Sequence, residues 1–93
     1  MNEEKSETER IIKLAERVEE KTRQKSPVKE FLALEQFAKE IIKAKINKGL
    51  KIRIRDIILE ILTNENKNFD NNLRIRKIII LLKLNLYKIK IKF

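Results

Sequence analysis

The sequence predicts an all-α fold, a small bundle of about four helices with a possible short β-like C-terminal tail. Tight turns of all-β folds depend on Gly and Pro, and this chain of 93 residues has one of each. Apolar residues recur at helical spacing in four successive segments. Neither an internal repeat nor a Ser/Gly-rich linker separates these segments, so residues 6–93 are expected to form a single helical domain after a disordered N-terminus, residues 1–5.

The first helix is expected from about Ser6 to Lys25, where residues with high helix propensity predominate. Its charged residues form both attractive and repulsive pairs four positions apart, a pattern typical of a solvated face. Apolar residues at helical spacing make up a narrow inner face: Ile11, Leu14, Ala15 and Val18.

The clearest boundary in the sequence is Ser26-Pro27, because Ser suits an N-cap and Pro suits the first helical position, where an N–H would be unpaired. A second helix is therefore expected to begin there and to end before Gly49, which suits the left-handed residue that follows a helix. The apolar face of this helix is wide: Val28, Phe31, Leu32, Leu34, Phe37, Ala38, Ile41 and Ile42.

A third helix is expected from about Ile52 to Asn64, although residues 50–55 alternate between apolar and basic and are also compatible with a short strand. The Asn-rich stretch over residues 63–72 predicts a turn. The residues suited to cap the next helix are Asp70, Asn71 and Asn72.

The fourth helix is expected from about Leu73 to Leu86 and contains an uninterrupted apolar run, Ile78 to Leu82. Such a run is apolar on every side of a helix, so it must be covered on most sides. The narrow face of the first helix offers little cover, and a partner chain could supply the rest. After this helix, residues 87–93 alternate with a period of two, which is typical of a strand or an extended tail.

The composition excludes most enzyme classes. The chain has neither Cys nor His, so it lacks the residues for the usual zinc sites, for Ser-His-Asp or Cys-His nucleophile systems and for a proton shuttle at neutral pH. Glu16, Glu19 and Glu20 cluster on one helix, but without His, a Gly-rich loop or an Asp-x-Asp pattern they are weak evidence for a metal site. The sequence therefore predicts a protein that is not an enzyme and uses no metal or other cofactor.

The sequence predicts a cytoplasmic protein. Its longest uncharged apolar stretch, Ile78 to Leu82, is far shorter than the about 20 residues that span a membrane. The N-terminus carries acidic residues where a secretory signal carries a basic and then an apolar segment. No membrane association is therefore expected.

Positive charge is concentrated in the second half of the chain. The formal net charge is +9; residues 1–46 hold 11 basic and 10 acidic side chains, and residues 47–93 hold 12 basic and 4 acidic ones. Such asymmetry favours a polyanionic partner, usually a nucleic acid. The competing explanation is a biased composition, rich in Lys, Ile and Asn.

Basic residues near the starts of the third and fourth helices are the candidate phosphate-contacting residues. The unpaired N–H groups at a helix start attract phosphate oxygens, and Arg adds bidentate hydrogen bonds. In the alternative interpretation the arginines are solvated or paired with Asp56, Glu60, Glu65 and Asp70. The predicted nucleic-acid-binding residues are Lys48, Lys51, Arg53, Arg55, Arg74, Arg76 and Lys77.

Two hypotheses for function follow. The leading one is a non-enzymatic nucleic-acid-binding protein, or a small subunit of a nucleoprotein assembly, that contacts DNA or RNA phosphates through its basic C-terminal half. The alternative is a helical protein–protein interaction module that oligomerises through its apolar fourth helix. In either case we expect a homo-oligomer or a heteromeric subunit, because a four-helix body of this length cannot readily bury the whole run from Ile78 to Leu82.

Overall fold

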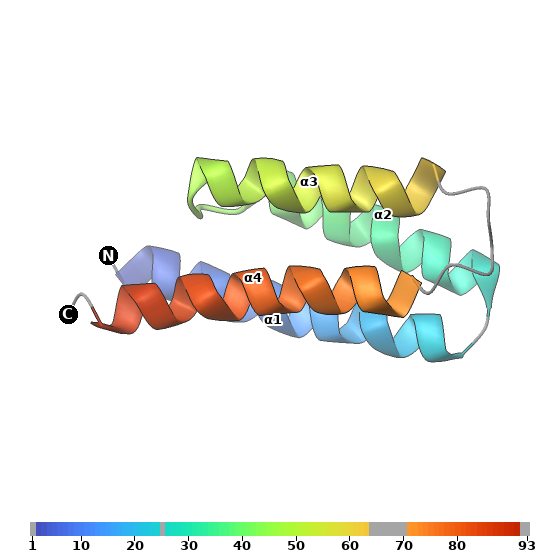
Figure 1. Ribbon diagram of the computed structural model, residues 1–93, viewed down its shortest axis with the longest axis horizontal. Coiled ribbons are helices and arrows are strands. Elements are labelled where there is room, and N and C mark those ends of the chain that lie inside the picture. The colour runs from blue at the N-terminus through green and yellow to red at the C-terminus, as the bar shows by residue number, and fades with distance from the viewer. Residues whose placement is uncertain (1, 25, 64–70, 92–93) are drawn as a thin grey trace.

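The computed structural model describes residues 2–24, 26–63 and 71–91, and within these ranges the regular elements are four α-helices and no strand. The helices lie along the long axis of the molecule, and each runs antiparallel to the next (Figure 1). The all-α prediction is confirmed. The helices are α1 (Asn2–Arg23), α2 (Pro27–Lys43), α3 (Lys48–Thr63) and α4 (Asn71–Ile91).

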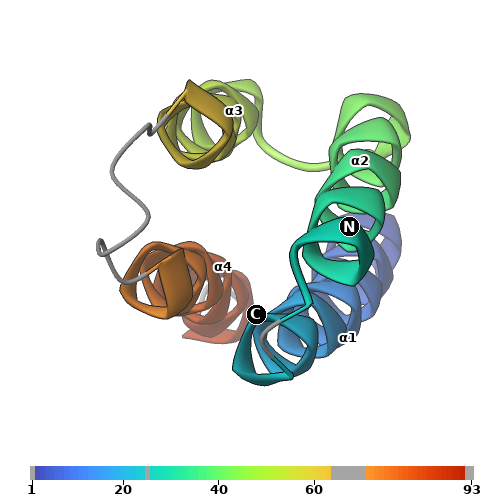
Figure 2. The same cartoon turned by 90° about the vertical axis from the view of Figure 1, so that its right-hand side faces the viewer.

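Viewed end-on, the helices occupy the corners of a four-sided bundle in chain order (Figure 2). α1 packs against α2 and α4, and α3 packs against the same two helices. The Cα atoms extend over 42 × 19 × 18 Å. Because neighbours are antiparallel, the starts of α1 and α3 lie at one end of the long axis, together with the ends of α2 and α4 (Figure 1).

Each helix contributes large side chains to one core. Ile11 of α1, Phe37 of α2, Ile54 of α3 and Ile78 of α4 are fully buried. The narrow apolar face of α1 is sufficient for its place in the bundle, because the small Ala15 is buried as well and allows a neighbouring helix to approach. Burial of apolar area from all four helices is the main force that holds them together.

The apolar run in α4 is largely covered by the chain itself. Ile78, Ile79 and Leu82 are buried and Leu81 is half-buried, whereas Ile80 is exposed. The bundle itself thus supplies most of the cover that a partner chain was expected to complete, and the expected oligomer stays a prediction. α1 and α3 flank α4 on two sides, and only the side that faces away from both is left open.

The boundary between α2 and α3 differs from the prediction. α2 ends at Lys43, and Gly49 lies in the first turn of α3, so it is not the left-handed residue after α2. The side chain of Asn47 explains the difference, because its Oδ1 accepts a hydrogen bond of 3.1 Å from the backbone N–H of Leu50. This bond satisfies one of the N–H groups at the start of α3 and makes Asn47 the N-cap.

The other helix boundaries are as follows. α2 begins at Pro27, as predicted, although the Ser26 side chain makes no capping hydrogen bond. α1 already begins at Asn2 and includes residues 2–5. Residues 50–55 are helical, which settles the alternative left open for them. Asp70 lies outside the described residues, and Asn71 and Asn72 are the first two residues of α4.

The predicted β-like tail is wrong for residues 87–91, because α4 continues to Ile91. A strand would place Ile89 and Ile91 on the same face, whereas a helix separates them. Ile89 is buried and Ile91 is exposed. Burial of Ile89 thus stabilises a helix in a segment whose alternation of apolar and polar residues indicates a strand. Residues 92–93 lie outside the described part of the chain.

Candidate interaction surfaces

The predicted nucleic-acid-binding residues face different sides of the bundle. Lys48, Lys51 and Arg55 line a groove between α2 and α3, whereas Arg53 lines a cavity between α3 and α4. On α4, Arg74 turns toward Glu60 of α3 and Arg76 toward Glu19 of α1. The structure therefore does not bring the seven residues together into one basic patch.

Three of the four arginines pair with acidic residues. Arg55 contacts Asp56 at 3.5 Å, Arg74 contacts Glu60 at 3.6 Å, and Arg76 contacts Glu19 at 2.9 Å. The alternative interpretation of these arginines is thus supported for Asp56 and Glu60, although Glu65 and Asp70 lie outside the described residues. The Arg55–Asp56 pair is exposed on both partners and therefore weak, so it would not prevent contact with another polyanion, whereas the Glu19 side chain is only 13% exposed.

The lysines and the fourth arginine have different surroundings. Lys51 donates a hydrogen bond of 3.0 Å from Nζ to the carbonyl oxygen of Ile42, close to the end of α2. A cation there compensates the partial negative charge of that helix end. Lys48, Arg53 and Lys77 are exposed and pair with no acidic residue in the described part of the chain.

The outward side of α4 is a second apolar face. Five large apolar residues of α4 keep between 52% and 65% of their surface exposed. Together with Lys77 they recur at alternating steps of four and three residues, the spacing of a coiled-coil seam. We call this row the α4 outer stripe: Leu73, Lys77, Ile80, Leu84, Tyr87 and Ile91.

Basic residues border the α4 outer stripe on both sides. Helical spacing places Arg76, Lys83 and Lys90 along the edge next to α1 and Arg74 and Lys88 along the edge next to α3. α4 contains no acidic residue. The surface is therefore an apolar row between two basic rows, with Glu19 of α1, which pairs with Arg76, at its margin.

The α4 outer stripe was not predicted from the sequence. The run over residues 78–82 is apolar on every side of a helix, and that run alone was the evidence for an interface. The signal that could have located the stripe was the step pattern of four and three residues from Leu73 to Ile91. That signal is ambiguous in the sequence, because the buried row through Ile75, Ile78 and Leu82 has a similar spacing.

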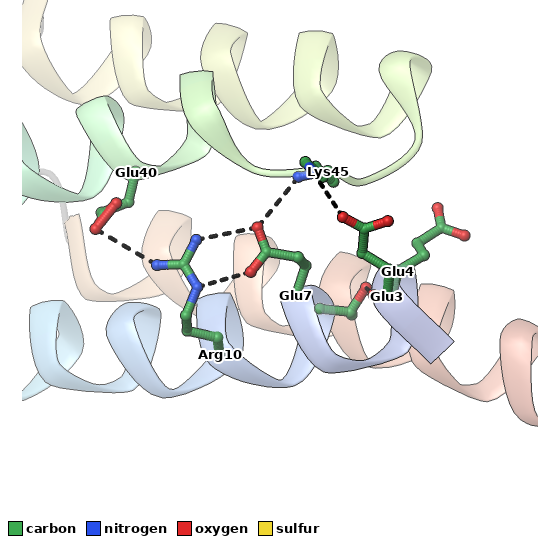
Figure 3. Close-up of polar contacts among 7 residues, drawn as sticks. Glu3, Glu4, Glu7, Arg10, Glu40 and Lys45 are labelled. Carbon is green, nitrogen blue, oxygen red and sulfur yellow. Dashed lines mark hydrogen bonds and ion pairs between the residues drawn. The ribbon is translucent and has the colours of Figure 1, made fainter. Parts of the chain in front are cut away.

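A cluster of charged residues joins α1 to the connection between α2 and α3 (Figure 3). Arg10 donates two hydrogen bonds to the Glu7 carboxylate, at 2.9 and 3.2 Å, and contacts Glu40 of α2 at 3.4 Å. The backbone N–H of Lys45 donates a hydrogen bond of 3.3 Å to the Glu7 carboxylate, and the Nζ of Lys45 lies 2.7 Å from the Glu3 carboxylate. These contacts attach the start of α1 to residue 45, next to the N-terminal end of α3.

Electrostatics in this cluster follow from its hydrogen bonds. The bonds from Arg10 and, secondarily, from the Lys45 N–H lower the pKa of Glu7. Glu7 raises the pKa of Arg10, and Glu3 raises the pKa of Lys45. Each shift stabilises the charged form, so the cluster is a set of structural ion pairs.

A cavity of 710 Å³ lies between the start of α3 and the end of α4. The charged residues that line it are Glu4, Arg53 and Lys88, of both signs. None of them is a nucleophile with an adjacent base. Over the described ranges, no group of three or more acidic residues is placed to hold a metal ion.

No helix in the described part of the chain has the length and apolar character needed to cross a membrane. No protein-family model matches the sequence, and comparisons with curated proteins and with solved structures give no match.

Proposed function

We propose that this protein is an interaction module that binds an acidic amphipathic helix of another protein along the α4 outer stripe. The observation that carries the proposal is the apolar row from Leu73 to Ile91, exposed along the length of α4 and bordered by basic side chains. Coiled-coil pairs are built in this way, with an apolar seam for affinity and charged flanks for partner choice. Acidic residues in the partner's flanks would complement Arg76, Lys83, Lys88 and Lys90.

A second copy of the chain is a poor occupant of this surface. Two α4 helices side by side would bring basic flanks together in either orientation, because α4 has no acidic residue. The acidic helix of the chain is α1, and none of its described residues is an exposed large apolar one. The charge and the apolar pattern together therefore favour a heteromeric partner.

Nucleic acid is the competing partner and stays a prediction. Its support is the net charge of +9. Against it, the seven predicted residues face different sides of the bundle, and phosphate contacts give no role to Ile80, Leu84 and Tyr87. An anionic membrane surface is another competitor, but the α4 outer stripe is a single row with Lys77 inside it, narrower than the face that an interfacial helix buries.

The test uses a designed peptide of 21 residues, the length of α4, with Leu at heptad positions a and d and Glu at e and g. Repulsion between Glu flanks keeps such a peptide from pairing with itself. The variant Ile80→Gln/Leu84→Gln removes apolar side chains from the α4 outer stripe and keeps good helix formers. We expect the peptide to bind the α4 outer stripe of this variant at least about tenfold more weakly than that of the wild-type protein.

Val28→Gln/Leu32→Gln is the matched control, because both residues are exposed on α2 and away from α4. This variant should bind the peptide like the wild-type protein. The proposal fails if the α4 variant binds the peptide normally. It also fails if a mixed-sequence DNA duplex or phosphatidylglycerol vesicles bind more tightly than the peptide. Nucleic acid would be indicated as the partner if DNA binding weakens steeply as the salt concentration rises and neither variant changes that binding.

A further inference from the structure

A second apolar surface lies between α2 and α3. It is a groove of 570 Å³, which we call the α2–α3 groove. Its partly exposed apolar side chains keep between 43% and 74% of their surface in contact with solvent. They are Ile42 of α2 and Ile52, Leu59 and Leu62 of α3. Ile41 and Ile58 form its buried floor.

The charge in the α2–α3 groove has one sign and lies toward one end. All the charged side chains that line the groove are basic, namely Lys48, Lys51 and Arg55. All three belong to the first half of α3, whereas the groove continues past them to Leu62. A partner that fits this surface therefore carries an apolar row together with acidic groups that meet the basic end.

The α2–α3 groove and the α4 outer stripe are separate surfaces. α2 and α4 occupy opposite corners of the bundle, and α3 stands between them (Figure 2). α3 turns Glu60 toward Arg74 of α4 and turns Leu59 into the α2–α3 groove. Because the two surfaces lie on different sides of α3, one bound helix cannot cover both.

The shape of the α2–α3 groove favours a helix over a small amphiphile. Sites for small molecules enclose most of their ligand, but the apolar residues of this groove are themselves about half-exposed. A helix with a diameter of about 10 Å would lie across the groove and cover both edges. On α3, the row Lys48, Ile52, Arg55, Leu59 and Leu62 repeats the steps of four and three residues found in the α4 outer stripe.

We infer that the α2–α3 groove is a second docking site for an acidic amphipathic helix, so that one chain holds two partner helices, one on each side of α3. The inference rests on the groove and its basic residues, independently of the α4 outer stripe. The α4 helix of a second copy does not fit the α2–α3 groove, because α4 has no acidic residue. The α1 helix of a second copy does not fit the groove either, because no described residue of α1 is a large apolar residue that is exposed.

The experiment is a calorimetric titration of the full chain with the same designed acidic peptide. Wild-type protein should bind two peptides per chain. Ile42→Gln/Leu59→Gln in the groove and Ile80→Gln/Leu84→Gln on α4 should each reduce the number to one, and the combination of all four should reduce it to zero. Val28→Gln/Leu32→Gln should still bind two peptides, and circular dichroism should show that every variant keeps its helices.

Each other result has a defined meaning. One peptide per chain, lost only in the α4 variant, would overturn the second site and leave the proposed function standing. One peptide per chain, lost only in the groove variant, would support the groove and overturn the proposed function. Concentration-dependent dimerisation that Ile42→Gln/Leu59→Gln abolishes would show the groove to be an interface between copies and would overturn the inference.

The basic residues of the groove provide a second readout. Lys48→Gln/Arg55→Gln should weaken the groove site at least about threefold and reduce its dependence on salt, because two charge contacts are removed. The control is Lys83→Gln, which lies on α4 and should leave the groove site unchanged. If Lys48→Gln/Arg55→Gln abolishes binding of a DNA duplex while Ile42→Gln/Leu59→Gln has no effect on it, the groove binds a polyanion and the inference is wrong.

Discussion

Arg76 of α4 holds its Nε 2.9 Å from Oε2 of Glu19 in α1, in an ion pair whose carboxylate side chain is only 13% exposed. That oxygen accepts no hydrogen bond from the described residues, so the Arg76 charge is its compensation. The pair links the two helices that form the most extensive packing contact in the bundle (Figure 2).

Removing Arg76 should therefore cost more than a typical surface ion pair. We expect Arg76→Gln to lower the free energy of unfolding by about 1–2 kcal/mol, because it leaves the nearly buried Glu19 carboxylate with only Arg23, which lies 3.5 Å from its other oxygen. The double variant Glu19→Gln/Arg76→Gln should recover part of this loss. Urea unfolding of the four proteins in a double-mutant cycle measures the coupling, and additive effects would show that the pair contributes nothing.

The Glu7 cluster predicts a loss of stability in acid. The pKa of Glu7 is lower in the folded protein than its ordinary value of 4.5, because Arg10 and the Lys45 N–H bond to the carboxylate. Stability from a lowered pKa is present above the unfolded value and disappears as the pH falls through the folded value. Wild-type protein should therefore be more stable than Glu7→Gln at pH 7, and this difference should shrink as the pH falls below 4.5 and vanish once the pH is below the folded pKa of Glu7.

Urea unfolding at a series of pH values tests this expectation. Glu9→Gln is the control, since Glu9 is exposed and forms no ion pair with the described residues. A stability difference for Glu7→Gln that is the same at pH 3 and pH 7 would contradict the role assigned to the carboxylate.

Gly49 provides a test of the boundary between α2 and α3. A Cβ at this position would meet Asn47 Oδ1, the capping atom of α3, at 3.2 Å. Asn47→Ala should lower stability by about 1 kcal/mol through loss of the cap. In that background Gly49→Ala should raise stability by about 0.5–1 kcal/mol, because Gly49 is helical and Ala has the higher helix propensity.

In the wild-type background the gain from Gly49→Ala should be smaller, because the new methyl group presses on the Asn47 cap. Thermal unfolding of the three variants measures both effects. A marked loss of stability from Gly49→Ala in both backgrounds would instead place Gly49 in a left-handed conformation after α2.

Truncation of two isoleucines in the apolar run should have very different effects on stability. Ile78 is fully buried, and Ile78→Ala should cost about 2–5 kcal/mol through lost burial and a cavity. Ile80 is 57% exposed, so Ile80→Ala should change stability by no more than about 0.5 kcal/mol. Chemical denaturation measures both, and a similar large cost at both positions would mean that α4 is covered on its outer side as well.

The four helices could be predicted from the sequence because helix formation depends mostly on local properties. Helical spacing, Pro27 and the scarcity of Gly and Pro indicate the elements without any knowledge of their neighbours. The errors occurred where a tertiary contact decided between local alternatives. Burial of Ile89 favours the continuation of α4 through a segment with strand-like alternation, and Asn47 rather than Gly49 marks the boundary of α3.

The charge asymmetry and the identity of the basic residues were also determined by the sequence alone. What it could not determine was their placement, since only the packing of the helices turns Lys51 and Arg55 of α3 toward α2 and Arg53 toward α4. The same limit applies to the apolar rows of α4. Ile78 and Ile80 have identical side chains, and only the packing of α1 and α3 against one side of α4 buries the first and leaves the second exposed.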